Sequence, residues 1–101
     1  MIVIEKTAYE EIFRTCEFKR ADGQGWLNDL ETIVSAEVII IERSTGSDVS
    51  ATMASDVAPY NSTQGRYKLK VGTFGKTYYI RVRGLSSNGQ KFEEVFELRI
   101  I

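Results

Sequence analysis

The last third of the chain alternates apolar and polar side chains with a period of two. One run covers residues 78–83 and the other covers residues 92–100. A period of two indicates β-strands that each bury one face. Between the runs lies Ser86-Ser87-Asn88-Gly89, and an Asn-Gly pair supplies the positive φ angles that a tight hairpin turn requires. The pattern therefore predicts a C-terminal β-hairpin.

Four earlier segments also read as strands. Residues 12–18 are rich in β-favouring side chains, although Thr7-Ala8-Tyr9-Glu10 before them fits a helix capping box and allows one helical turn. Residues 31–43 contain the consecutive apolar residues 38–41, which predict a central strand buried on both faces. Val49, Ala51 and Met53 indicate a short edge strand, and residues 66–71 resume the alternation.

These elements predict an all-β protein, an immunoglobulin-like antiparallel β-sandwich of about seven strands. A chain of 101 residues has room for a single β-sandwich domain, residues 1–101. Residues 1–11 are expected to form a flexible or strand-exchanging N-terminal arm. Residues 54–65 carry the one proline and few large apolar groups, and they are predicted to be the longest loop.

The composition excludes several classes of protein. The sequence has no run of 18 apolar residues, and residues 2–4 are followed at once by Glu5 and Lys6, so we expect neither a membrane span nor a signal peptide. With one cysteine, Cys16, and no histidine, the usual zinc, copper and haem sites and the Ser-His and Cys-His dyads are not expected. We interpret Cys16 as a small buried apolar side chain.

No catalytic, metal or cofactor site is predicted. The acidic residues near turns do not follow a calcium-loop spacing, and Gly23 and Gly25 form a G-x-G with no following helix. Glutamates on strand faces without a cleft are usually solvated, so a glycosidase pair is not expected either. The acidic side chains concerned are Asp22, Asp29, Glu31, Asp48, Asp56, Glu93 and Glu94.

Charge is divided unevenly along the chain. The formal net charge is −1, but residues 1–65 hold 5 Lys/Arg against 11 Asp/Glu, whereas residues 66–101 hold 8 against 3. Three interpretations of the basic residues remain open: a solvated sheet face, a nucleic-acid platform, and a face that meets the acidic part of a neighbouring copy to close a ring. Because the whole chain is slightly acidic, nucleic acid is not the expected partner. The residues concerned are Lys68, Lys70, Arg81 and Arg83, with Tyr79 among them.

The aromatic residues suggest a different surface. Trp26 lies before a polar corner, where it either packs at the rim of the sandwich or offers a stacking platform. A carbohydrate- or host-surface-binding adhesion module would use Trp26, Tyr60 and Tyr67 as sugar-stacking aromatics. Exposure of all three on one surface would favour that alternative, and burial would argue against it. The possible interface residues are Lys68, Lys70, Arg81, Arg83, Tyr60 and Trp26.

Two stretches of the sequence carry a family resemblance. They are Leu30-Glu31-Thr32-Ile33-Val34-Ser35-Ala36-Glu37-Val38, and Gly75-Lys76-Thr77-Tyr78-Tyr79-Ile80-Arg81-Val82 with Ser87-Asn88-Gly89-Gln90 and the closing Phe96-Glu97-Leu98-Arg99-Ile100. They resemble the small β-sandwich virion proteins of tailed bacteriophages and prophages, such as fibre-tail adaptor and head-tail connector components. The resemblance covers roughly residues 13–101.

The resemblance implies a structural role without catalytic activity. It implies a non-enzymatic structural subunit of the tail, the fibre-tail adaptor or the head-tail junction, made in the bacterial cytoplasm and acting in the virion. Its partners would be other virion proteins and, on assembly, further copies of itself in a ring, with no cofactor, no nucleic acid and no membrane.

Overall fold

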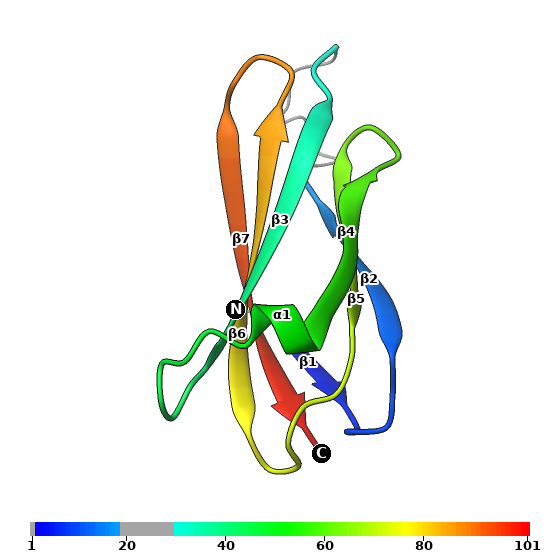
Figure 1. Cartoon of the computed structure of the whole chain (residues 1–101). Helices are drawn as coiled ribbons and strands as arrows, with labels where there is room; N and C mark the ends of the chain where they lie inside the picture. The colour runs from blue at the N-terminus through cyan, green and yellow to red at the C-terminus, as the bar shows by residue number, and fades with distance from the viewer. Residues whose placement is uncertain (1, 19–29) are drawn as a thin grey trace.

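The computed structural model describes residues 2–18 and 30–101, and their strands form two sheets (Figure 1). The chain follows the order β1, β2, β3, α1, β4, β5, β6, β7. The strands are β1 (Ile2–Lys6), β2 (Ile12–Glu17), β3 (Ile33–Glu42), β4 (Ala54–Tyr60), β5 (Gln64–Leu69), β6 (Thr77–Ser86) and β7 (Lys91–Ile100), and α1 is the single turn Ser50–Met53. None of the described residues forms a helix long and apolar enough to cross a membrane.

The larger sheet has the order β1-β7-β6-β3 and the smaller sheet has the order β2-β5-β4. All pairs are antiparallel except β1 and β7, which run parallel with Ile2 beside Phe96 and Lys6 beside Ile100. The predicted antiparallel sandwich therefore contains one parallel pair.

The core lies between the two sheets. Gly65 of β5 faces Ala36 of β3 and Val82 of β6, so the sides of the two sheets that carry these residues are the inner sides of the sandwich. Alternate residues of each strand point inward, as a half-buried strand requires. The buried apolar residues are Ile4, Cys16, Phe18, Ile33, Val38, Ile40, Met53, Tyr67, Leu69, Tyr78, Ile80, Val82, Phe96, Leu98 and Ile100.

The predicted C-terminal hairpin is confirmed. β6 and β7 pair from Thr77 beside Arg99 to Leu85 beside Lys91, and Gly89 in the turn has a φ of 80°. The Ser86 hydroxyl donates a hydrogen bond to the buried carboxylate of Glu31 and accepts one from the Gln90 amide at 3.1 Å. The segment before β3 is thus tied to the turn of the hairpin.

The position of β3 differs from the prediction. β3 is an edge strand of its sheet, not a central strand buried on both faces. Val38 and Ile40 face the core, whereas Ile39 and Ile41 lie on the outer face and keep partial exposure. Their register neighbours are Arg81 and Tyr79, long side chains whose stems can cover apolar surface without a third layer of protein.

The predictions for two segments between β3 and β5 are wrong. Residues 50–53 form the helical turn α1, not a strand, and the Asp48 carboxylate accepts the hydrogen bonds of the Ser50 amide and hydroxyl at 2.9 and 2.6 Å. The predicted 54–65 loop is instead β4, a turn, and the first residues of β5. β4 escaped the pattern because it is mostly exposed and its register shifts between Ser55 and Ala58.

The N-terminal residues are part of the fold. The predicted arm, residues 1–11, contains β1, which pairs with β7 of its own chain. Thr7 and Glu10 form the reciprocal capping-box bonds, at 2.7 and 3.3 Å, in a turn that no helix follows. The strand preferred for residues 12–18 is confirmed as β2.

Candidate protein-interaction surface

The outer side of the β2-β5-β4 sheet carries a cluster of exposed aromatic and half-buried basic side chains. We call Phe13, Tyr60, Arg66 and Lys68 the aromatic–basic face. The inward residues of β2 and β5 alternate with Phe13, Arg66 and Lys68, so the strand period directs these three side chains outward. Tyr60 of β4 is paired with Gln64 of β5, which has the same parity as Arg66, and so lies on the same side. Phe13 is 49% exposed and Tyr60 is 38% exposed, values more typical of polar residues than of aromatic ones.

Arg66 lies between two aromatic rings. Its guanidinium carbon is 4.2 Å from the centroid of Phe13 and 4.9 Å from the centroid of Tyr60. The Lys68 ammonium lies 5.6 Å from the Phe13 centroid and forms an ion pair with Glu11 at 3.2 Å. Cation–π contacts of this kind hold the guanidinium in place without consuming its N–H donors.

The two basic side chains of the face differ in their ion pairing. Within residues 2–18 and 30–101, Lys68 has a carboxylate partner but Arg66 has none. A planar guanidinium with its donors available is suited to a bidentate contact with a carboxylate. The face therefore combines fixed aromatic surface with an orientated positive charge.

The predicted basic surface does not exist as one patch. Arg81 and Arg83 lie on the outer side of the β1-β7-β6-β3 sheet, whereas Lys68 lies on the outer side of the other sheet, facing the opposite direction. Sequence reasoning placed these residues together because both strands alternate in the same way, but β5 and β6 belong to different sheets. Lys70 follows the last residue of β5 and is half-buried.

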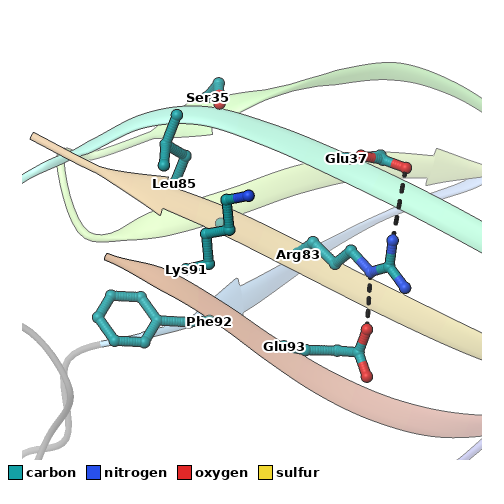
Figure 2. Close-up of a pocket in the computed structure, with 8 residues that line it drawn as sticks. Ser35, Glu37, Arg83, Leu85, Lys91, Phe92 and Glu93 are labelled. Atoms are coloured by element: carbon teal, nitrogen blue, oxygen red, sulfur yellow. Dashed lines mark hydrogen bonds and ion pairs between the residues drawn. The ribbon is translucent and has the colours of Figure 1, made fainter. Parts of the chain in front are cut away.

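Arg81 and Arg83 are neutralised by neighbouring carboxylates. Both donate to Glu93 of β7, at 2.9 and 2.7 Å, and Arg83 lies 3.9 Å from Glu37 of β3. Figure 2 shows the Arg83 guanidinium between these two glutamates. The hydrogen bond from Arg83 lowers the pKa of the Glu93 carboxyl, and Arg81 acts in the same direction. This surface is a self-contained ion-pair network.

A hollow of about 390 Å³ adjoins this network. Its lining includes Ser35, Leu85, Lys91 and Phe92 besides the charged residues (Figure 2). The ammonium, guanidinium and carboxylate groups in it are of mixed sign, and none forms a nucleophile–base pair.

The three aromatics proposed for sugar stacking do not form one exposed platform. Tyr67 is 1% exposed, and burial raises the pKa of its hydroxyl to about 12. Tyr60 is exposed but is covered on one side by Arg66. Trp26 lies outside the described residues.

Cys16 is buried and keeps its proton at neutral pH. Burial, assisted by Glu94 and Glu17, raises the pKa of the Cys16 thiol to about 12, so the thiolate is scarce at neutral pH. Cys16 is 3% exposed, which confirms its interpretation as a buried apolar side chain. The described residues contain no group of three or more metal-ligating side chains, and the candidates Asp22 and Asp29 lie outside them.

Sequence reasoning recognised part of the aromatic–basic face. It named Tyr60 and Lys68 as interface candidates but missed Phe13 and Arg66. A usable signal existed, because Phe13 has the opposite parity to Cys16 and Phe18 and therefore had to face outward. The neighbourhood of Tyr60 and Arg66 depends on the β4–β5 pairing, which the predicted loop concealed.

Comparison with known proteins supports the architecture. No protein-family model matches the sequence, and no curated protein matches it. The chain is similar to a solved structure of murine CRIg, an immunoglobulin-like domain, with a TM-score of 0.56 and 9% identity over 98% of this chain and 92% of that one. At this identity the likeness concerns the fold alone. The chain is an all-β protein with an immunoglobulin-like β-sandwich fold, as its strand pattern predicted.

Proposed function

We propose that this chain is a non-enzymatic subunit that acts through protein–protein contacts, with the aromatic–basic face as its contact surface. The observation that carries the proposal is the stack of half-buried Arg66 between the exposed rings of Phe13 and Tyr60, with separations of 4.2 and 4.9 Å. Aromatic residues and arginine are the side chains most enriched in the centres of protein interfaces. Their fixed arrangement lowers the entropy lost when a partner binds.

The charge of the face indicates the chemistry of its partner. Arg66 has no carboxylate partner among the described residues, and the rings on either side of it are partly exposed. We expect a partner protein that presents an Asp or Glu side chain to Arg66, flanked by apolar groups that cover Phe13 and Tyr60. Such a contact is a charge-assisted, bidentate hydrogen bond.

The assembly proposed for this contact is the virion of a tailed phage or prophage. The support is the sequence resemblance of residues 13–101 to small β-sandwich virion proteins, together with a β-sandwich that offers faces and edges for packing between subunits. The partner would accordingly be another tail or head-tail protein.

The nucleic-acid alternative is weaker than the protein-contact proposal. A single-strand platform needs several unpaired cations along one groove. Arg81 and Arg83 share Glu93, and Lys68 is paired with Glu11 on the opposite side of the molecule. The proposal of an adhesion module loses its stated platform because Tyr67 is buried.

Site-specific photo-crosslinking tests the proposed face. The photoreactive residue p-benzoylphenylalanine replaces Phe13 in one variant and, as a matched control, Tyr79 on the outer side of the other sheet. In cells that make the chain together with its neighbouring gene products, we expect one dominant adduct from position 13, whose partner is identified by mass spectrometry. A virion protein would support the assembly proposal; a partner with no place in a particle would contradict it.

Binding to the purified partner then tests the residues. We expect Arg66→Gln and Tyr60→Ser each to weaken binding at least about tenfold, a change of about 1.4 kcal/mol. The matched variant Arg81→Gln should leave binding unchanged, because Arg81 lies on the other sheet. Equal loss from Arg81→Gln, or no loss from either face variant, would contradict the proposed surface.

A further inference from the structure

The two edges of the β2-β5-β4 sheet differ in their protection against pairing with another strand. β4 has a register shift between Ser55 and Ala58, a positive φ of 54° at Asp56, and Pro59, which has no N–H. Bulges and prolines are the devices by which edge strands avoid pairing with other chains. The β4 edge is protected.

The β2 edge has none of these devices. Its six residues pair with β5 from Ile12 beside Leu69 to Glu17 beside Gln64 without a register shift. The strand contains no proline and no glycine, and its central residue Thr15 is exposed. Within the described residues, the β2 edge therefore has neither a bulge nor a proline, and a regular edge of this kind is a template for strand addition.

The hydrogen bonds around β5 show which groups point to the open edge. The Phe18 amide donates to the Thr63 carbonyl at 3.0 Å on the β2 side, and the Lys70 amide donates to the Met53 carbonyl at 2.9 Å on the β4 side. In an antiparallel sheet the bonded residues alternate along each strand. The even-numbered residues of β2 therefore bond to β5, and Phe13 and Thr15 direct their N–H and C=O groups away from it.

The topology places no other described strand beside β2. In constant-type immunoglobulin domains the corresponding sheet has four strands, and the first strand of the chain lies next to the second. Here β1 instead pairs with β7 of the other sheet, which leaves a three-stranded sheet that ends at β2 (Figure 1). The position that a fourth strand occupies in those domains is next to Phe13 and Thr15.

We propose that β2 pairs antiparallel with β2 of a second copy of this chain, around a two-fold axis at Thr15. The N–H and C=O groups of Thr15 point away from β5, so this register is possible. The main-chain N–H of each Thr15 would donate a hydrogen bond to the carbonyl of the other Thr15. The other directly opposed pairs are Phe13 with Glu17, Arg14 with Cys16, and Ile12 with Phe18. No like charges face each other directly, and the central pair is a Thr–Thr pair, which is favourable in antiparallel sheets.

The pairing would join the two small sheets into one six-stranded sheet. The aromatic–basic faces of the two copies would then lie on the same side of it and remain accessible. A contact made by one six-residue strand falls below the area of a stable interface, so the dimer should be weak and reversible. This inference is independent of the proposed partner for the aromatic–basic face.

A proline at position 15 tests the pairing directly. Thr15→Pro removes an N–H that points away from β5, so the ladder to β5 is kept, whereas Thr15→Val keeps the N–H and serves as the matched control. Sedimentation equilibrium from micromolar to millimolar concentration should give a monomer–dimer equilibrium for the natural chain and for Thr15→Val. We expect Thr15→Pro to weaken dimerisation at least about tenfold.

Amide hydrogen exchange gives a second, independent measurement. The Phe13 and Thr15 amides of the natural chain should gain protection as the concentration rises through the dimerisation range, and the Arg14 amide should be protected at every concentration. Circular dichroism and the urea midpoint establish that Thr15→Pro is folded. If Thr15→Pro does not fold, the hydrogen-exchange measurement on the natural chain alone tests the proposed pairing. A monomer at every concentration, a dimer that Thr15→Pro leaves intact, or protection unchanged at Phe13 and Thr15 would each overturn the proposal.

Discussion

The ammonium group of Lys6 donates a hydrogen bond to the main-chain carbonyl of Val71, a residue 65 positions later in the sequence. The same group donates to the carbonyls of Thr7 at 2.8 Å and Glu10 at 2.9 Å, so all three N–H donors have acceptors. Lys6 is 1% exposed, and burial lowers the pKa of its ammonium while Glu10 and Glu11 oppose that change. The lysine ties β1, the turn after it and the loop before β6 together.

Replacing Lys6 by methionine should destabilise the protein. Methionine fills a similar volume but donates no hydrogen bonds, so three carbonyl groups lose their partner. We expect a loss of about 1–3 kcal/mol in the free energy of unfolding, measured by urea denaturation. Lys76→Met is the matched control, because its ion pair with Glu42 is partly exposed and such pairs contribute at most about 1 kcal/mol. Equal losses in the two variants would contradict a structural role for Lys6.

The Cys16 thiol should make stability fall at alkaline pH. Its folded-state pKa is about 12 against an ordinary value of 9.0, so between these values the unfolded chain loses the proton that the folded chain keeps. The stabilisation is complete below pH 9 and is lost as the pH rises toward 12. Over the first unit, from pH 9 to 10, the loss should be about 1 kcal/mol.

Cys16→Val isolates this effect. The variant has no titrating group at position 16, so its free energy of unfolding should fall less between pH 9 and 10 than that of the natural chain. Tyr67, whose pKa rises from 10.0 to about 12, titrates in both proteins, mostly above this interval. Urea midpoints at pH 7, 9 and 10 give the comparison. Parallel curves for the two proteins would show that Cys16 is not the group responsible.

Two glycines facing the core should respond differently to alanine. A Cβ atom on Gly84 would lie 2.9 Å from the ring of Phe18, which is fully buried and cannot move aside, whereas one on Gly65 would have no contact closer than 3.4 Å. Gly84→Ala should therefore cost about 1–3 kcal/mol by overpacking, and Gly65→Ala should stay within about 1 kcal/mol of the natural chain. Urea midpoints of the two variants, compared side by side, should show this order. If Gly65→Ala were the more destabilising variant, the ring of Phe18 would not lie against Gly84 as described.

The contact between Phe13 and Arg66 should be measurable as a coupling energy. A double-mutant cycle with Phe13→Leu and Arg66→Gln should give about 0.5–1 kcal/mol, the range for cation–π contacts near the surface. The same cycle with Arg83→Gln in place of Arg66→Gln should be additive, because Arg83 lies on the other sheet. Zero coupling in the first cycle would mean that solvent separates the two groups.

The sequence by itself determined the elements in which alternation and turn chemistry agree. β6, β7 and their Asn-Gly turn were predictable because one face of each strand is buried and the turn needs glycine-like conformations. β2 followed from the β-favouring composition of residues 12–18, and β5 followed from alternation, although it begins two residues before the predicted start at residue 66. The lack of histidine and the single cysteine narrow the range of possible chemistry through composition alone, because the side chains that most often bind metals or activate nucleophiles are missing or solitary.

Only the tertiary structure decided which strands share a sheet. The alternation of apolar and polar residues shows which side chains of a strand point outward. It does not show which sheet the strand belongs to, because that depends on pairing between residues far apart in the chain. For this reason Lys68 and Arg83, which resemble each other in sequence context, lie on opposite sides of the molecule, while Phe13, Tyr60 and Arg66 meet across three strands. β4 is mostly exposed and is interrupted by a bulge, so its sequence shows no regular alternation of apolar and polar residues. Its place in the sheet is therefore visible only from its pairing with β5.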